Sequence, residues 1–248
     1  MDVVEIAVVG VVGMTLLLIA VEFIHPARRF EEVAGWRLKC LAFIPVVIAI
    51  SSGIPFLLAG VIADVRLLPG DRLGLVGGTV VGIVLSEFIV YWVHRLHHDV
   101  SVLWRWVHQL HHSAERMDVF GAAYFHPLEI LEGTVVGVFF FSVVLGLTPE
   151  AAALSVIWQG FNGVFQHGNI KTPTWLGYII QRPEQHGIHH QRGVHGYNYA
   201  NLPLWDILFG TFRNPEDWEG LAGFYSGSSK PTVRMLLGRD VSRGWPPA

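Results

Sequence analysis

The chain has 248 residues, a formal net charge of −3 and a single cysteine, Cys40. Apolar residues make up 52% of it and charged residues 15%, whereas an ordinary soluble domain is about 25% charged. The small net charge without a basic block argues against nucleic acid as a partner. One cysteine excludes an intramolecular disulfide framework and any cysteine-ligated zinc or iron–sulfur site. The composition favours one membrane-embedded domain with at most a small appendage.

Three apolar stretches in the first hundred residues predict membrane-spanning helices, since roughly 20 apolar residues cross a bilayer as a helix. The first stretch follows an acidic start, Met1-Asp2, which differs from the basic start of a signal peptide, so we expect a retained helix. The second contains Pro45 and Pro55, which membrane helices tolerate. The three predicted spans are residues 3–24, 40–62 and 73–93.

A fourth apolar region, residues 133–166, is divided by the turn signal Thr148-Pro149-Glu150. Its arms of about 15 and 17 residues are short for full spans. The pattern therefore predicts a helical hairpin that enters the membrane and returns. Between the third span and this hairpin, residues 99–132 are mixed in character, and we expect helix and loop on the membrane surface.

Histidines form three clusters that share the spacing His, two other residues, His, His. Positions i, i+3 and i+4 of a helix lie on one face, so each cluster could direct its imidazoles into a single volume. Neutral imidazole binds zinc, copper, iron and nickel, and one ion takes about four to six ligands, so eight or more histidines suit two ions. The clusters are His94, His97 and His98; His108, His111 and His112; and His186, His189 and His190.

The loop charges predict on which side of the membrane these clusters lie. Basic residues favour the cytoplasmic side, and the loop after the first span carries four of them. The third span then ends at His94 on the cytoplasmic side, and the returning hairpin brings His167 to the same side. The four basic residues are Arg28, Arg29, Arg37 and Lys39.

Glu87 is the only charged residue within the third span. An ionisable side chain in a membrane helix is costly and suggests a function. It lies two turns before His94, with Tyr91 between them. Two roles fit equally well: holding a metal-binding histidine through its second nitrogen, or pairing with another helix.

These motifs together resemble those of the fatty acid hydroxylase/sterol desaturase superfamily, integral-membrane di-iron enzymes. The resemblance extends over roughly residues 80 to 213. The His-Arg-x-x-His box matches His94 and His98 and leaves His97 as a spare. The other matching segments are His108–His112, Phe125–Glu129 with its His126-Pro127 pair, His167-Gly168, His186–His190, Asn198-Tyr199 and Trp205–Thr211.

The resemblance implies an all-α, integral-membrane helical bundle of about three spans plus a helical hairpin. A cytoplasmic histidine-rich cap would hold a dimetal site. We expect N-terminal membrane helices and loops in residues 1–72, a catalytic domain in residues 73–213 and a C-terminal tail in residues 214–248.

The resemblance also implies an activity: two iron ions that use O2 to hydroxylate or desaturate a C–H bond of a lipid, such as a sterol or a fatty acyl or alkyl lipid. Iron comes from the resemblance alone, because an all-imidazole site suits zinc, copper and nickel as well. Glu87, Tyr91 and His126 are expected beside the metal ligands. The implied ligands are His94, His98, His108, His111, His112, His167, His186, His189 and His190.

The electron donor is expected to be a separate reductase, because the chain has no haem-binding or dinucleotide-binding fingerprint. Two other functions stay open. A membrane metal transporter or metal-binding protein would place its ligands near mid-membrane on broken helices, whereas these clusters lie at helix ends. A haem electron-transfer protein would have no need of adjacent histidine pairs. The lipid itself and the choice between hydroxylation and desaturation stay open.

Overall fold

The computed structural model describes residues 1–62 and 65–242, and the regular elements of this part of the chain are all helices, without a strand. Four apolar helices are long enough to cross a membrane. They are α1 (Val3–Ile24), α2 (Trp36–Ile62), α3 (Gly74–Asp99) with the short η1 (Gly70–Leu73) before it, and α6 (Pro127–Val138) continued by η4 (Phe139–Val144). The all-α membrane bundle predicted from the sequence is confirmed.

Three helices extend beyond their predicted limits. The second begins at Trp36 rather than at residue 40. The third helix continues to Asp99, so the first histidine cluster lies on its last turns. The first arm of the hairpin begins at Pro127 rather than at residue 133 and is long enough to be a span. Pro127 suits the first turn of a helix, and the His126 side chain caps it by accepting the Leu128 N–H.

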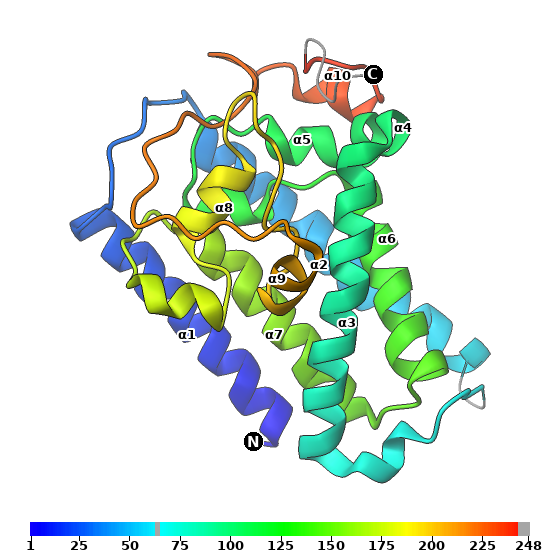
Figure 1. Cartoon of the computed structure of the whole chain (residues 1–248). Helices are drawn as coiled ribbons and strands as arrows, with labels where there is room; N and C mark the ends of the chain where they lie inside the picture. The colour runs from blue at the N-terminus through cyan, green and yellow to red at the C-terminus, as the bar shows by residue number, and fades with distance from the viewer. Residues whose placement is uncertain (63–64, 243–248) are drawn as a thin grey trace.

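The long helices run side by side and α7 (Pro149–His167), the returning arm, lies among them (Figure 1). Both α1 and α3 pack on α7, whereas α2 packs on α6. Glycines allow α3 to approach α7 closely: a Cβ on Gly78 would lie 3.0 Å from the Cβ of Ala151, and one on Gly82 would clash with the Ser155 hydroxyl. Small side chains at such contacts are typical of membrane helices.

Shorter elements gather at one end of the bundle and form a cap (Figure 1). Two further short elements, η5 (Thr174–Tyr178) and α9 (Leu204–Phe209), also belong to the second half of the chain. The cap elements are α4 (Ser101–Leu103), η2 (Trp104–His108), α5 (Gln109–His112), η3 (Val119–Ala123), α8 (Pro183–His189) and α10 (Thr232–Leu236).

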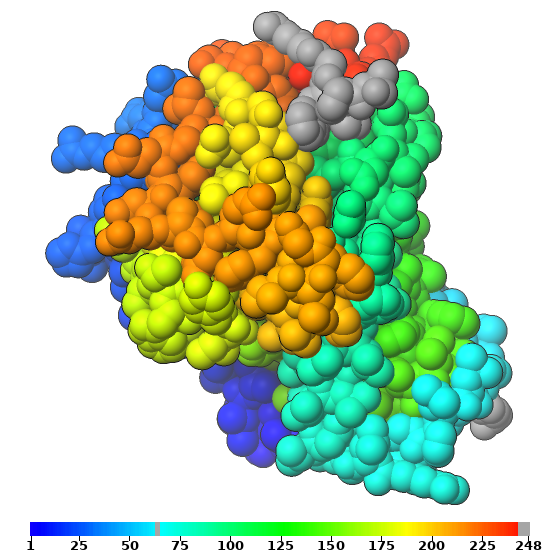
Figure 2. All heavy atoms as spheres, in the orientation of Figure 1, coloured from blue at the N-terminus to red at the C-terminus, as the bar shows by residue number. Residues whose placement is uncertain are grey.

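Carboxylates attach the first helix and the C-terminal segment to the cap, and the one on the first helix is buried. Glu22, at the end of α1, accepts the backbone N–H groups of Val119 and Asn169 at 2.9 and 3.0 Å. Glu115 accepts the hydroxyl of Ser229 at 2.7 Å. Residues 213–242 therefore lie over the cap, as Figure 2 shows. The proposed division into residues 1–72, 73–213 and 214–248 stays a prediction.

Candidate metal centre

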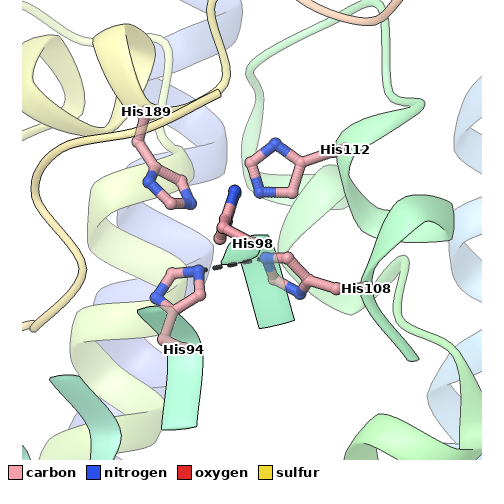
Figure 3. Close-up of side chains that lie close together, drawn as sticks. All are labelled: His94, His98, His108, His112 and His189. Atoms are coloured by element: carbon pink, nitrogen blue, oxygen red, sulfur yellow. Dashed lines mark hydrogen bonds between the residues drawn. The ribbon is translucent and has the colours of Figure 1, made fainter. Parts of the chain in front are cut away.

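The structure brings all nine predicted ligand histidines together, in two groups. Within each group, one nitrogen of every ring lies within 4.8 Å of the others. Figure 3 shows the rings of the first group pointing toward one another. We call them group 1, which is His94, His98, His108, His112 and His189, and group 2, which is His111, His167, His186 and His190.

The two groups divide each His-x-x-His-His box between them. His108 and His112 belong to group 1, whereas His111 belongs to group 2. The last box is divided in the opposite sense, since its first and last histidines are in group 2 and His189 is in group 1. Residues i and i+4 point about 40° apart on a helix, but i+3 and i+4 point about 100° apart. The expectation that each box serves a single volume was therefore wrong.

Several rings are held through Nδ1 by groups that only accept hydrogen bonds. Backbone carbonyls have no hydrogen to donate, so an imidazole that bonds to one must carry its proton on Nδ1 and a lone pair on Nε2. The carbonyl pairs are His94 with Tyr199 (2.7 Å), His189 with Tyr197 (2.8 Å), His167 with Gly163 (2.6 Å) and His111 with Tyr124 (3.4 Å).

Nε2 atoms face one another in both groups, and in the group 2 pair both rings carry their proton on Nδ1. The Nε2 atoms of His94 and His108 are 3.0 Å apart, and those of His111 and His167 are 3.2 Å apart. Two lone pairs at this distance repel unless a cation lies between them. Neighbouring ligands of an ion with nitrogen at about 2.1 Å are themselves about 3 Å apart. Both groups therefore fit a metal ion.

Buried nitrogens without a partner support the same conclusion. In the part of the chain that the structure describes, both ring nitrogens of His98 and the Nε2 atoms of His112 and His189 have no hydrogen-bond partner. A buried polar atom without a partner costs free energy. Metal coordination would satisfy one nitrogen in each of the three rings.

Burial also keeps the imidazoles in the form that binds metal. It lowers the pKa of His186, His189 and His190 well below the usual range, and neighbouring imidazoles lower it further. The same causes, burial first, lower the pKa of His108 and His112. These rings are therefore neutral at pH 7, as metal ligation requires.

A carboxylate pair on α6 lies beside the histidines and was not singled out from the sequence. Glu129 accepts from Nδ1 of His108 at 2.7 Å. Glu132, one turn later, pairs with Nε2 of the spare His97, also at 2.7 Å. The signal was present, because Glu129 belongs to the His-Pro segment and Glu132 shares its helical face. Such carboxylates orient metal-binding histidines.

His195 is a further residue that sequence reasoning missed. Its Nδ1 lies 3.0 Å from Nδ1 of His112, and burial lowers its pKa to about 3. A lone histidine in a loop gives no signal in the sequence. The contact makes His195 a support for His112.

Glu87 does not contact His94, so the first of its two open roles, holding a ligand histidine directly, is not seen. Its carboxylate accepts from the backbone and side chain of Asn201, at 2.9 and 3.0 Å, and from the backbone of Leu202 at 3.3 Å. The second nitrogen of His94 is instead taken by the Tyr199 carbonyl, in the same loop.

Tyr91 and His126 also make their hydrogen bonds away from both histidine groups. The Tyr91 hydroxyl accepts from Arg95 at 3.0 Å, and its ring packs against Tyr199 with centroids 5.8 Å apart. His126 accepts from Leu128 at 3.1 Å as the cap of α6. It therefore helps to place Glu129 rather than a metal ion.

A cavity of about 380 Å³ lies between α3, α6 with η4, and α7, and reaches both histidine groups. His94, His108, His111 and His186 line one end, and its walls are mainly apolar. Gly133 on α6 and Gly160 and Gly163 on α7 also line it, and a Cβ at any of the three would meet nothing within 4 Å. The cavity can therefore admit an apolar chain to the histidines.

Comparison with known proteins agrees with this geometry. An ornithine lipid hydroxylase of Rhizobium tropici, OlsE, is 34% identical over 148 residues, 55% of this chain and 42% of that protein. A putative Delta(7)-sterol-C5(6)-desaturase 2 of Arabidopsis thaliana is 32% identical over 140 residues, 54% of this chain and 47% of that protein. Human alkylglycerol monooxygenase is 32% identical over 131 residues, 51% of this chain and 28% of that protein.

The chain thus spans less than half the length of these three relatives. No solved structure matches it. The family model described as fatty acid hydroxylase matches residues 79–211, the segment that contains every histidine of both groups. With more than half of its residues in that match, the chain belongs to the fatty acid hydroxylase family.

Proposed function

We propose that the protein is a membrane-bound di-iron oxygenase that hydroxylates or desaturates a C–H bond of a lipid, using O2 and electrons from a separate donor. Three kinds of observation support this: family membership, the apolar cavity and the two histidine groups. The Nε2 atoms of His111 and His167, 3.2 Å apart, carry most weight, because the Nδ1 atom of each ring donates to a carbonyl and two facing lone pairs repel unless a cation lies between them.

Group 1 would hold one ion and group 2 the other. When bound, a pair of iron ions would supply the activation of O2 for attack on an unactivated C–H bond. The protein keeps the ligand imidazoles neutral by burial and fixes their direction through carbonyl groups and Glu129. The all-imidazole donor set also accepts zinc, copper and nickel, so iron rests on the family resemblance.

The cavity would hold the apolar tail of the substrate. The walls of Val90, Val93, Val136 and Phe140 offer dispersion contacts and exclude water from the reacting carbon. Relatives are named for an ornithine lipid, a sterol and an alkylglycerol, which all combine a polar part with an apolar one. A lipid of this general form is the substrate class we infer.

The cap would face the cytoplasm, where a reductase can reach it. The basic residues Arg28 and Arg29 precede α2 near this end of the bundle, and Arg37 lies in its first turn. Arg105 and Arg116 lie between α3 and α6 along the chain. The positive-inside tendency supports that orientation. A thiol reagent that cannot cross membranes should label an introduced cysteine at Arg239, an exposed cap position, only in inverted vesicles.

The decisive experiment is metal content per chain on protein purified in mild detergent without a histidine tag. About two irons per chain, together with an oxidised lipid product in the presence of a reductase and O2, would support the oxygenase. Zinc would call for reconstitution with iron before the product assay. Absence of bound metal after reconstitution, or one haem per chain, would contradict the proposal and favour the transport or electron-transfer alternatives.

A further inference from the structure

Residues 197–212 form a loop, the short helix α9 and a return beside α3. We propose that this segment enters the bilayer without crossing it, and from there holds two histidines of group 1 in place. The first part of the proposal concerns a contact with lipid and is independent of the reaction. The second part rests on the proposed function, because it treats His94 and His189 as metal ligands.

The position of α9 along α3 gives its depth. The indole N–H of Trp205 donates to the carbonyl of Val84 at 3.0 Å, and the ring of Phe209 lies 5.0 Å from those of Tyr91 and Trp92. Val84 is about 15 Å along α3 from Gly74, at 1.5 Å per residue. A hydrocarbon core is about 30 Å thick. Trp205 therefore reaches mid-depth if the core begins near Gly74.

Charged groups mark that boundary. Arg66 and Asp71, just before α3, form an exposed ion pair at 3.0 Å, which belongs in water or among headgroups. The N-terminus of α1, with exposed Asp2 and Glu5, lies at the same end of the bundle (Figure 1). Counted from this level, the hydrocarbon core extends to about His94, some 20 residues further along α3.

The outer surface of the segment is apolar, as a lipid contact requires. Leu208 is 62% exposed and Ile207 46%, whereas Asp206 on the same short helix is buried. Neighbouring η5 adds Trp175 and Tyr178, each more than 60% exposed, and Tyr178 packs on Phe212 with centroids 5.4 Å apart. Figure 2 shows these two apolar elements side by side along the lower edge of the cap.

The N–H groups of residues 199–202 are satisfied without water, as irregular chain within a membrane requires. Asp206 accepts the N–H groups of Tyr199 and Ala200 at 2.8 and 2.9 Å. Glu87 accepts those of Asn201 and Leu202 at 2.9 and 3.3 Å. Two carboxylates thus replace the water that four consecutive amides would otherwise need. This accounts for an ionisable residue within α3.

The same loop provides the acceptors for two histidines of group 1. The carbonyl of Tyr199 bonds to Nδ1 of His94, and that of Tyr197 to Nδ1 of His189. Tyr197 has a positive φ of 67°, which an L-residue adopts only when its surroundings enforce it. Glu87 is therefore a positioning residue that acts on His94 through the backbone of residues 199–202.

Depth can be measured with a nitroxide label in proteoliposomes, with Cys40 first replaced by alanine. A label at Leu208 (Leu208→Cys) should collide with O2 and be protected from a water-soluble nickel chelate, as should one at Val80 on α3. A label at the exposed cap residue Lys230 is the aqueous control. Exposure of the Leu208 label to nickel, or protection from both reagents by a protein partner or second copy, would overturn the lipid contact.

The effect of Glu87 on metal binding by group 1 can be measured on cobalt-loaded protein. Glu87→Gln should reduce bound cobalt from two ions per chain toward one and alter the visible spectrum, whereas Glu150→Gln, at the exposed start of α7, should change neither. If Glu87→Gln does not accumulate, Asn201→Ala, which removes one of the three bonds to Glu87, should shift the spectrum in the same way.

The two possible failures are distinguishable. Two bound ions and an unchanged spectrum in both variants would overturn the positioning role while leaving the oxygenase proposal intact. A wild-type protein that binds no metal would overturn the oxygenase and the positioning role together. The depth of Leu208 would still be decided by the nickel and O2 measurements.

Discussion

At the scale of single residues, the two nitrogens of each ligand histidine have different roles. Nδ1 of His94, His108 and His167 is occupied by a carbonyl or a carboxylate, and Nε2 is left for metal. The supporting acceptor is a backbone carbonyl in most cases, which no substitution can remove directly. Glu129 is the exception, because its side chain holds His108, so its substitution tests directly whether such a contact strengthens metal binding.

Glu129→Gln should weaken metal binding. The amide can still accept from His108, but the negative charge that strengthens the imidazole as a ligand is lost. Loss of such an outer partner costs about 10–100-fold in metal affinity. Glu132→Gln is the matched control, since its partner His97 belongs to neither group. Metal titration followed by spectroscopy compares the two, and equal affinities would contradict the assigned role of Glu129.

The adjacent pair His97 and His98 allows a second comparison at this scale. His98→Ala removes a ring with two unpartnered nitrogens in group 1 and should lower metal content per chain. His97→Ala breaks a pair with Glu132 and a ring contact with His108, and should leave metal content near that of the wild type. Elemental analysis of both purified variants measures their metal content per chain. A lower metal content in His97→Ala than in His98→Ala would show that His97, not His98, is the ligand.

At the scale of elements, the centre depends on helices that keep an open space between them. Tight packing of α3 on α7 is made possible by Gly78 and Gly82, whereas α6 packs mainly on α2. The cavity lies between α6 and the α3–α7 pair. Glycine therefore serves two purposes in these helices: contact at Gly82 and open space at Gly160.

Gly160→Leu should narrow the cavity and reduce turnover of lipids with long tails, while metal content stays unchanged. The added side chain would fill space that contains no atom within 4 Å of its Cβ. Gly13→Leu on α1 is the control, because its Cβ also meets open space but does not line the cavity. Product analysis over a series of tail lengths tests this, and equal activities for the two variants would argue against a tail in this cavity.

Gly82→Ala should destabilise the bundle by about 1–3 kcal/mol, the usual cost of overpacking. The new methyl would meet the Ser155 hydroxyl, so the double variant with Ser155→Gly should recover part of the loss. Gly10→Ala, where space is open, should have little effect. Thermal unfolding in detergent measures all three, and a neutral Gly82→Ala would mean that α3 and α7 can separate without cost.

At the scale of the whole molecule, burial of many histidines links stability to pH. In the metal-free protein, burial lowers the pKa of His195 to about 3 and those of His186 and His190 well below the normal value near 6.5. Below pH 6.5 the unfolded chain therefore binds protons that the folded chain does not, so stability falls as pH falls.

Thermal unfolding of the metal-free protein should consequently show a midpoint that decreases between pH 7 and pH 5. Each buried imidazole contributes up to about 1.4 kcal/mol per pH unit in this range. Metal-loaded protein should be more stable than metal-free protein at pH 7 and should lose part of that advantage as protons compete for the ligands. A midpoint that stays constant over the range would contradict neutral, buried histidines.

The sequence by itself determined the class of fold, the nine candidate ligands and the family, because apolar length and histidine spacing are local properties of the chain. It could not determine how the histidines divide between groups 1 and 2. The three histidines of a His-x-x-His-His box share one face of a helix, and only the packing of neighbouring helices decides which group each imidazole joins. The partners of Glu87, His97 and His195 are more than 30 residues away in sequence and become visible only when α3, α6 and the 199–202 loop pack together. The tertiary structure therefore decided which histidines face one another, and which carboxylates and carbonyls orient them.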